Sequence, residues 1–277
     1  MRLMYFLLLF LINPNIYSQT FDETVLLADK MLKNNDFKKA IELYKRISFF
    51  SEEKDFITFK KIANCYYNLT NYKLANSYLD SALLYCNTKN ELININFLKI
   101  DCFIFLEEYY QAKHIISSLK IDSTNILFQK TSFYLGIINF AETDYINAEK
   151  HFLKSINDTS IIKKEKIRLA FKNKNKLKRP NPKIARTLSL IIPGGGQLYA
   201  GDYKNAANSF LLVAVFAAIG ADMYFSYAWY DSLISVFPWF YRYYNGGSKN
   251  AMQIAKQKRT LKQNNKLNEV FIILQKP

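Results

Sequence analysis

Four segments of 17 residues align without gaps and decide the fold of this chain: "ADKMLKNNDFKKAIELY" (28–44), "ANCYYNLTNYKLANSYL" (63–79), "IDCFIFLEEYYQAKHII" (100–116) and "GIINFAETDYINAEKHF" (136–152). Successive segments begin 35, 37 and 36 residues apart. A fixed period of this length indicates an array of repeats, each of which is one supersecondary unit.

The positions that the four segments share predict a pair of antiparallel helices in each unit. Every segment has an aromatic residue at its tenth position and an alanine at its thirteenth, and three of them begin with a small residue. Small side chains let two helices approach closely, and the aromatic closes the turn between them. Because one pair cannot bury its own apolar face, the pairs must stack. The residues expected to pack the repeats are Ala28, Phe37, Ala40, Ala63, Tyr72, Ala75, Tyr109, Ala112, Gly136, Tyr145 and Ala148.

This pattern resembles the tetratricopeptide repeat (TPR) over residues 20–160, with Ile100 in place of the usual small residue in the third unit. The resemblance implies an all-α fold, a curved TPR-like α-solenoid whose concave face binds a protein or peptide, and it implies no catalysis. A general helical bundle with accidental periodicity is the alternative.

The net charge of +15 is concentrated in two blocks. Residues 20–162 hold 17 Lys and Arg against 18 Asp and Glu, whereas residues 163–186 hold 11 against one and residues 242–277 hold eight against one. The section between the two blocks has only four charged residues, and basic borders of this kind favour a membrane segment flanked by anionic head groups. A nucleic-acid partner is not expected, because base stacking needs interleaved aromatic residues and residues 163–186 contain only Phe171.

The N-terminus has the order of a secretory signal. Arg2 precedes the apolar run "LMYFLLLFLI" (3–12), which is too short to span a bilayer. We expect export with cleavage near Ser18, and residues 1–18 are left out of the fold; an uncleaved anchor is the alternative.

The glycine-rich stretch "IIPGGGQLYAGDYKNAANSF" (191–210) does not match a nucleotide-binding loop, because no lysine and hydroxyl pair follows its glycines and no βαβ unit surrounds them. We expect instead a backbone bend that joins two short helical pieces or re-enters a membrane from one side. Residues 205–221 carry no charge, and irregular backbone in a bilayer must have its amides satisfied. The residues assigned to this membrane bend are Pro193, Gly194, Gly195, Gly196, Gln197, Tyr199 and Gly201.

The string from Pro193 to Ala206 also resembles the P-G-x-G-Q-x-Y-x-G signature of small bacterial membrane modules, some of which follow tetratricopeptide repeats in envelope proteins. The resemblance implies a location and an architecture but no chemistry. We therefore divide the chain into a signal peptide (1–18), four repeats (20–160), a basic linker (161–186), a membrane module with a helical transmembrane hairpin (187–245) and a basic tail (246–277) that packs on the protein or the membrane.

Asp222 is the one residue of this module for which a functional role is weighed. A carboxylate inside a membrane is costly and defaults to a functional hypothesis. The alternative, which we favour, is that the helix ends near Ala221 and leaves Asp222 among the head groups beside Tyr224 and Tyr227. The sidedness is unresolved, because a cleaved signal places the repeats outside the cytoplasm whereas the basic blocks favour the inside.

No enzyme is expected, with no catalytic residue, cofactor or metal site. Cys65, Cys86 and Cys102 have no metal-ligand spacing and are odd in number, and His114 and His151 are isolated. The sequence favours a membrane-anchored scaffold of the bacterial cell envelope, in the inner membrane with its repeats in the periplasm. Its expected partners are a protein client on the concave face and membrane lipids. The alternative is an oligomeric lipid-binding or transport element that uses the Pro193–Gly196 bend and Asp222.

Overall fold

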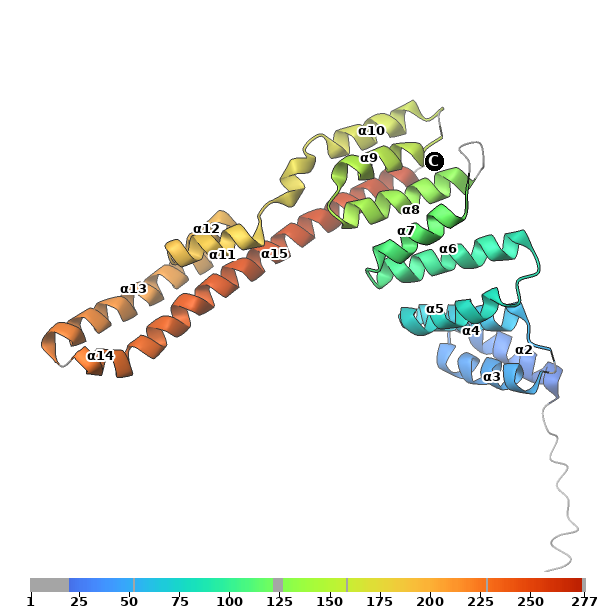
Figure 1. Cartoon of the computed structure of the whole chain (residues 1–277), viewed down its shortest axis with the longest axis horizontal. Coiled ribbons are helices and arrows are strands. Elements are labelled where there is room, and N and C mark those ends of the chain that lie inside the picture. Colours follow the sequence, from blue (N-terminus) through green and yellow to red (C-terminus); the bar gives the residue numbers. More distant parts are fainter. Residues whose placement is uncertain (1–19, 52, 122–126, 158, 228, 276–277) are drawn as a thin grey trace, which may run out of the picture. The chain divides into compact units, whose positions relative to one another are not determined.

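The computed structural model describes residues 20–51, 53–121, 127–157, 159–227 and 229–275, and within these ranges the chain is helical without strands (Figure 1). The all-α class predicted from the repeats is confirmed. The expected signal peptide and its cleavage near Ser18 lie outside the described residues. The described residues form two compact units, and the boundary between them falls in the connection that precedes Leu127.

The first unit consists of three helix pairs, each of which coincides with one of the predicted repeats. The pairs are α2 (Phe21–Lys33) with α3 (Phe37–Phe50), α4 (Phe56–Asn68) with α5 (Tyr72–Leu83), and α6 (Lys89–Phe105) with α7 (Tyr109–Ser118). Capping boxes begin the first and third pairs, where Thr20 pairs with Glu23 and Thr88 with Glu91. The aromatic at the tenth position of each segment is the first residue of its second helix.

The same turn joins the two helices in all four predicted repeats. The eighth residue of each 17-residue segment lies in this turn and has a positive φ, between 58° and 64°. These residues are Asn35, Thr70, Glu107 and Thr143. In the first repeat the Asn35 amide donates to the Leu32 carbonyl at 3.1 Å and the Asp36 amide donates to the Met31 carbonyl at 3.0 Å, and the other three turns repeat these bonds. The turn therefore satisfies carbonyls that the end of the first helix leaves open.

The small residues of the repeats lie where the two helices of a pair meet. Ala28, Ala40, Ala75, Ala112 and Ala148 are all 0% exposed, and Ala63 is 1% exposed. A side chain added to Gly136 would lie 2.7 Å from the ring of Phe152, so this position accepts only glycine without a shift of the ring. Ile100, which departs from the pattern, is also fully buried.

The fourth predicted repeat, α8 (Leu127–Ala141) with α9 (Tyr145–Lys154), belongs to the second unit. The remaining elements of this unit are α10 (Ile161–Phe171), the 3-10 helix η1 (Lys174–Lys178), α11 (Pro182–Ile191), α12 (Gly195–Tyr199), α13 (Tyr203–Ser226), α14 (Trp229–Ser235) and α15 (Phe237–Gln275). In Figure 1, α13 runs away from α12, and α15 returns beside it after α14.

The basic segment 161–186, which the sequence assigns to a linker, is largely helical and packed. Ile167, Phe171 and Leu177 are buried in one cluster with Phe152 of α9 and Val270 of α15. Pro182 is the first residue of α11, where its missing amide hydrogen costs the helix nothing. The lysines of this segment therefore lie on folded helices and not on an extended linker.

Helix α15 is continuous over 39 residues and contacts both ends of the second unit. Its first half packs against α11, α12 and α13, and its basic middle carries no break in the helix. Its apolar end packs on the fourth repeat through Leu267, Val270, Ile273 and Leu274. Of the two alternatives for the tail, packing on the protein is the one that the structure shows.

Candidate membrane-binding module

The glycine stretch joins α11 to α12, as expected for a bend between two helical pieces. Gly194 has a φ of +86°, and a side chain added to it would lie 2.4 Å from the carbonyl oxygen of Ala206 in α13. A side chain added to Gly196 would lie 1.8 Å from the carbonyl oxygen of Ala185 in α11. Both contacts are with backbone, which cannot move aside as a side chain can. These two glycines therefore allow α11, α12 and α13 to meet without a gap.

Gln197 connects three helices from a fully buried position. The Ser189 hydroxyl donates to Gln197 Oε1 at 2.8 Å, and Gln197 Nε2 donates to the carbonyl oxygen of Gly247 in α15 at 2.9 Å. The Gly196 amide completes the cluster by donating to Ser189 Oγ at 2.9 Å. Gln197 thus satisfies a carbonyl of α15. Removal of its amide would leave buried partners unpaired, a change that costs about 1–3 kcal/mol for each group.

The remaining bend residues also make contacts within the protein. The Asn181 amide donates to the phenolic oxygen of Tyr199 at 3.1 Å, and Lys258 Nζ donates to the Gly201 carbonyl at 2.9 Å. The Tyr244 hydroxyl donates to the carbonyl of Leu190. Pro193 and Gly195 occupy the connection and the first residue of α12. The motif is the structural junction of α11, α12, α13 and α15.

The turn between α12 and α13 has the same hydrogen bonds as the four repeat turns. Gly201 has a φ of 74°, its amide donates to the Leu198 carbonyl, and the Asp202 amide donates to the Gln197 carbonyl, both at 2.8 Å. Asp202 caps α13 by accepting from the Asn205 amide at 3.2 Å, just as Asp144 caps α9 by accepting from the Asn147 amide at 3.2 Å.

Residues 194–210 therefore follow the 17-residue template, with Gly194 first, Tyr203 tenth and Ala206 thirteenth. This fifth helix pair was not predicted. The signal was the likeness of "DYKNA" (202–206) to "DYINA" (144–148).

Helix α13 has the length and composition of a membrane span, and it is the one helix of the described residues that does. Its 24 residues extend about 36 Å, against about 30 Å for the hydrocarbon core of a bilayer. Core helices of water-soluble proteins can have the same length and composition, but they are buried. Only 6% of the most apolar window of α13 is buried.

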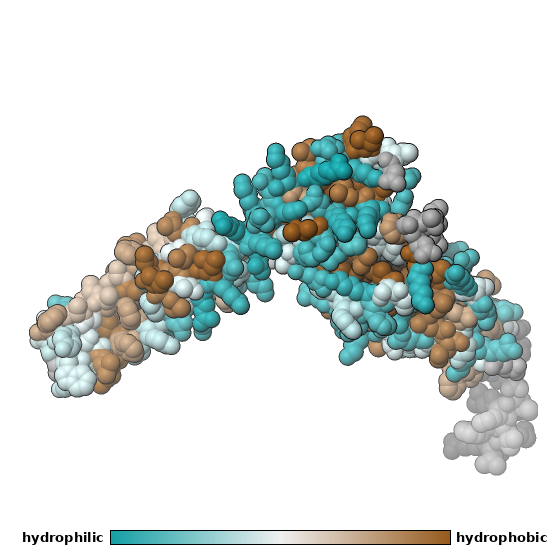
Figure 2. Space-filling model, turned by 45° about the horizontal axis from the view of Figure 1, so that its top comes forward, coloured by the Kyte–Doolittle hydropathy of each residue, from teal (hydrophilic) through white to brown (hydrophobic). Residues whose placement is uncertain are grey.

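The hairpin of α13, α14 and the first half of α15 exposes a continuous set of large apolar side chains. Figure 2 shows brown and pale surface gathered over this part of the second unit, with teal surface beyond it. The exposed residues include Phe210, Leu211, Val215, Ile219, Phe225, Leu233, Ile234, Phe237, Trp239 and Tyr241. A contiguous apolar patch of this kind marks a surface that is covered by lipid or by protein.

An aromatic stack and a hydrogen bond are among the interactions that join the helices of the hairpin. The rings of Phe216 in α13 and Tyr243 in α15 stack with their centroids 5.1 Å apart. The Ser232 hydroxyl donates to the carbonyl of Gly220 at 2.8 Å and ties α14 to α13.

Asp222 is exposed near the tip of the hairpin. Helix α13 continues to Ser226, so the expectation that it ends near Ala221 is wrong by more than one turn. Tyr224, Tyr227, Trp229 and Tyr230 are exposed around the same tip. Aromatic residues of this type are enriched where a membrane meets water.

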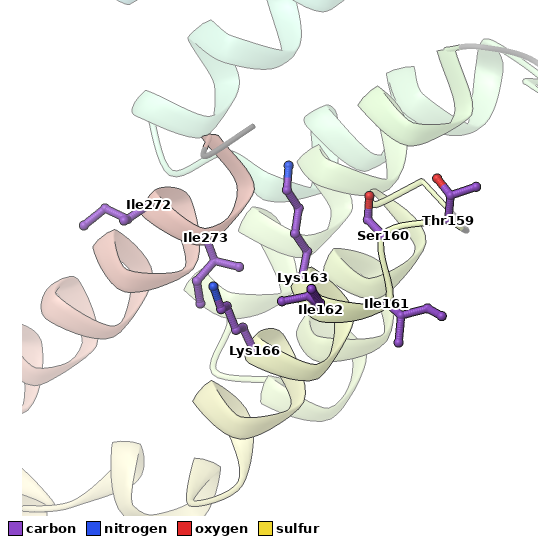
Figure 3. A pocket seen from close by; sticks show the side chains of 8 residues that line it. All are labelled: Thr159, Ser160, Ile161, Ile162, Lys163, Lys166, Ile272 and Ile273. Carbon is purple, nitrogen blue, oxygen red and sulfur yellow. The ribbon is translucent and has the colours of Figure 1, made fainter.

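A pocket of about 570 Å³ between α10 and the end of α15 is lined by isoleucines and lysines (Figure 3). Ile162 and Lys166 of α10 and Ile273 of α15 face the same space. The other lining residues are Thr159, Ser160, Ile161, Lys163 and Ile272. This lining set contains no carboxylate, thiol or imidazole that would serve as a base or a nucleophile.

The three cysteines are free thiols, and two of them are buried. Burial raises the pKa of Cys65 to about 11 and that of Cys102 to about 12, so both thiols are protonated near neutral pH. Among the described residues, no three His, Cys, Asp or Glu side chains are grouped closely enough to hold a metal ion.

The chain matches no protein-family model, and comparison with curated proteins and with solved structures also returned no match.

Proposed function

We propose that this chain is a membrane-anchored adaptor without catalytic activity. Its hairpin inserts into a bilayer, and its helical repeats form a TPR-like solenoid that binds a protein or peptide. We place it in the inner membrane of a bacterial cell envelope with its repeats in the periplasm.

The exposed surface of α13 is the observation that best supports insertion of the hairpin into a bilayer. A 24-residue helix with almost none of its apolar window buried is unstable in water, since each exposed large apolar side chain forgoes about 1.5–3 kcal/mol of burial. The described backbone of the hairpin is helical apart from Tyr227 and Val236, whose amides donate to the carbonyls of Met223 and Ser232. This meets the requirement that amides inside a bilayer bond internally.

The adaptor part is supported by the first unit. Its three helix pairs share one turn and one packing pattern, as arrays that bind other proteins do. It also exposes large apolar side chains that the fold does not use: Phe49 is 79% exposed, Phe50 67% and Leu84 80%. Such side chains are suited to contact with a partner.

Alkaline extraction of cell membranes tests the anchor on the full chain. The wild-type protein is expected to stay in the membrane pellet, and Leu211→Lys with Val215→Lys, two exposed positions of α13, should release it. Leu74→Lys with Leu84→Lys is the matched control, because these exposed leucines lie in the first unit. If the wild-type chain remains soluble after lysis without detergent, the proposal is wrong.

Site-specific photo-crosslinking tests the adaptor part. A crosslinker at Phe49 or Phe50 should capture the same partner repeatedly in intact cells, whereas one at exposed Lys150, in the fourth repeat pair, reports on a different surface. Capture at neither repeat position would contradict a docking role for the first unit.

A further inference from the structure

A groove of about 900 Å³ runs between α11 and α15 in the second unit. Pro182 and Arg186 form one wall, and residues of α15 from Lys249 to Asn264 form the other. Sites for small molecules occupy about 300–1,000 Å³, so the groove has room for a lipid head group and the start of its chains.

All the charged residues that line the groove are basic. Arg186, Lys249 and Lys256 line it, and no Asp or Glu is among the lining residues. Within the described part of the chain none of these three cations forms an ion pair, although Asp29, Asp80 and Glu149 elsewhere each pair with a lysine. Three unpaired cations on one groove attract an anion.

The rest of the lining is suited to an amphiphile. Met252 and Leu261 are apolar, whereas Gln253, Thr260 and Asn264 carry groups that can donate to or accept from the hydroxyls of a head group. An inorganic anion would leave the apolar side chains of Met252 and Leu261 without a partner.

The groove lies beside the base of the apolar hairpin. Lys249 comes two residues after Gly247, whose carbonyl binds Gln197 at the junction of the module. Helix α11, which forms the other wall, ends in the exposed apolar residues Leu190 and Ile191, and exposed Ile192 follows it. A lipid whose head group lies in the groove could therefore place its chains along apolar protein surface.

We propose that the α11–α15 groove binds the phosphate head group of an anionic phospholipid through Arg186, Lys249 and Lys256. This inference rests on the proposed membrane association, and it adds a specific lipid class to it. The lipid would hold α11 and α15 together, and it would fix the depth of the hairpin.

Native mass spectrometry of the full chain in a non-ionic detergent tests the proposal. The probes are phosphatidylglycerol, which is anionic, and phosphatidylcholine, which is zwitterionic. Wild-type protein should retain phosphatidylglycerol preferentially, and R186Q/K249Q/K256Q should lose about fivefold in affinity for each charge removed, or about a hundredfold in all. K163Q/K166Q/K172Q removes the same charge from α10 and its end, and it should keep the preference.

Three results would overturn the inference. The first is an unchanged lipid preference in the groove variant. The second is complete displacement of phosphatidylglycerol by inorganic phosphate at the same concentration, which would indicate a site for free anions. The third is a dimer that only the groove variant fails to form, which would assign the groove to a second copy of the chain.

Alkaline extraction of the same variants separates this inference from the proposed function. The groove variant should remain in the membrane pellet, because its hairpin is unchanged. A membrane-bound wild-type chain without any lipid preference refutes the groove alone, whereas a wild-type chain that leaves the membrane refutes the anchor.

Discussion

The side-chain amide of Gln263 in α15 donates a hydrogen bond of 2.6 Å to the phenolic oxygen of Tyr145, 118 residues earlier in the chain. Tyr145 is the aromatic that begins the second helix of the fourth repeat. Lys262 adds a bond from its Nζ to the Lys176 carbonyl at 2.8 Å. The helix that returns from the apolar hairpin is thus fastened to the last repeat pair through a residue that defines the repeat.

Val270→Asp should unfold the fourth repeat without releasing the chain from membranes. Val270 is 0% exposed within the cluster that contains Phe152 and Phe171, so an unpaired carboxylate there should cost roughly 3 kcal/mol or more. Limited proteolysis should show new cleavage in α8 to α10. Asn268→Asp adds the same charge at an exposed position two residues away and should leave the protection intact.

Gly196→Ala should destabilise the module, because its new methyl group would meet the Ala185 carbonyl at 1.8 Å. A loss of about 3 kcal/mol is expected, the upper end for overpacking. Gly246→Ala is the control: nothing lies within 4 Å of its added carbon, and the exchange should stabilise α15 by about 0.5–1 kcal/mol. Thermal unfolding in detergent, followed by circular dichroism, compares the two. Equal melting temperatures would contradict the junction described for Gly196.

Maleimide labelling near pH 7.5 should modify Cys86 alone in the folded protein. Cys65 and Cys102 are 0% exposed, and burial raises the pKa of both thiols well above this pH, whereas Cys86 is half-buried. Mass spectrometry should count one label before denaturation and three after it. The variant Cys86→Ser should take up no label until it is unfolded, and rapid labelling of this variant would show that the first unit opens.

The stability of the first unit should decrease in acid through Asp29. Burial raises the pKa of this carboxyl, but hydrogen bonds from Lys61 and Tyr44 outweigh burial and hold the pKa below its ordinary value of 3.8. A lowered pKa contributes stability above the unfolded value and loses it as the pH falls through the folded value. The contribution is below about 1 kcal/mol, because the side chain is 35% exposed and water screens the pair.

Urea unfolding at pH 7 and at pH 3 measures this contribution. Asp29→Asn should reduce the difference in unfolding free energy between the two conditions. Asp22→Asn, which removes an exposed carboxylate from the same helix, should change the difference less. The same loss in both variants would mean that total charge, and not the Asp29 contacts, sets the acid sensitivity.

Asp222→Asn should leave membrane association and stability unchanged within about 0.5 kcal/mol, as for surface positions in general. Asp222 is exposed close to the end of α13, among the aromatic residues of the hairpin tip. Alkaline extraction and partner crosslinking with the Asn variant provide the measurements. Loss of a cellular function with both assays unchanged would instead support the transport alternative.

Much of the fold could be predicted because its signals are local. A small residue, a turn and an aromatic at fixed spacing define each helix pair, so Ala40, Tyr72 and Ala148 were placed correctly within their helices. The glycine bend was also predicted, but its partners were not. The bond from Gln197 to Gly247 spans 50 residues, and no spacing in the sequence shows it.

The extent of α15 was the hardest feature to foresee. Its apolar end and basic middle have the composition of two different segments, and they suggested a tail separate from the module. The structure shows that one helix spans both and that its Val270 packs on the fourth repeat. Likewise, the lysines near Phe171 suggested a solvated linker, because charge on a helix surface does not reveal the apolar face beneath it.

The unbroken length of α15 makes it a lever. With 39 residues it extends about 58 Å, so a tilt of roughly 10° at one end displaces the other by about 10 Å. Helices in membranes tilt when bilayer thickness changes. If the hairpin lies in a bilayer as we propose, a change in the thickness of that bilayer would tilt this single helix and so move the last repeat pair, on which its other end packs.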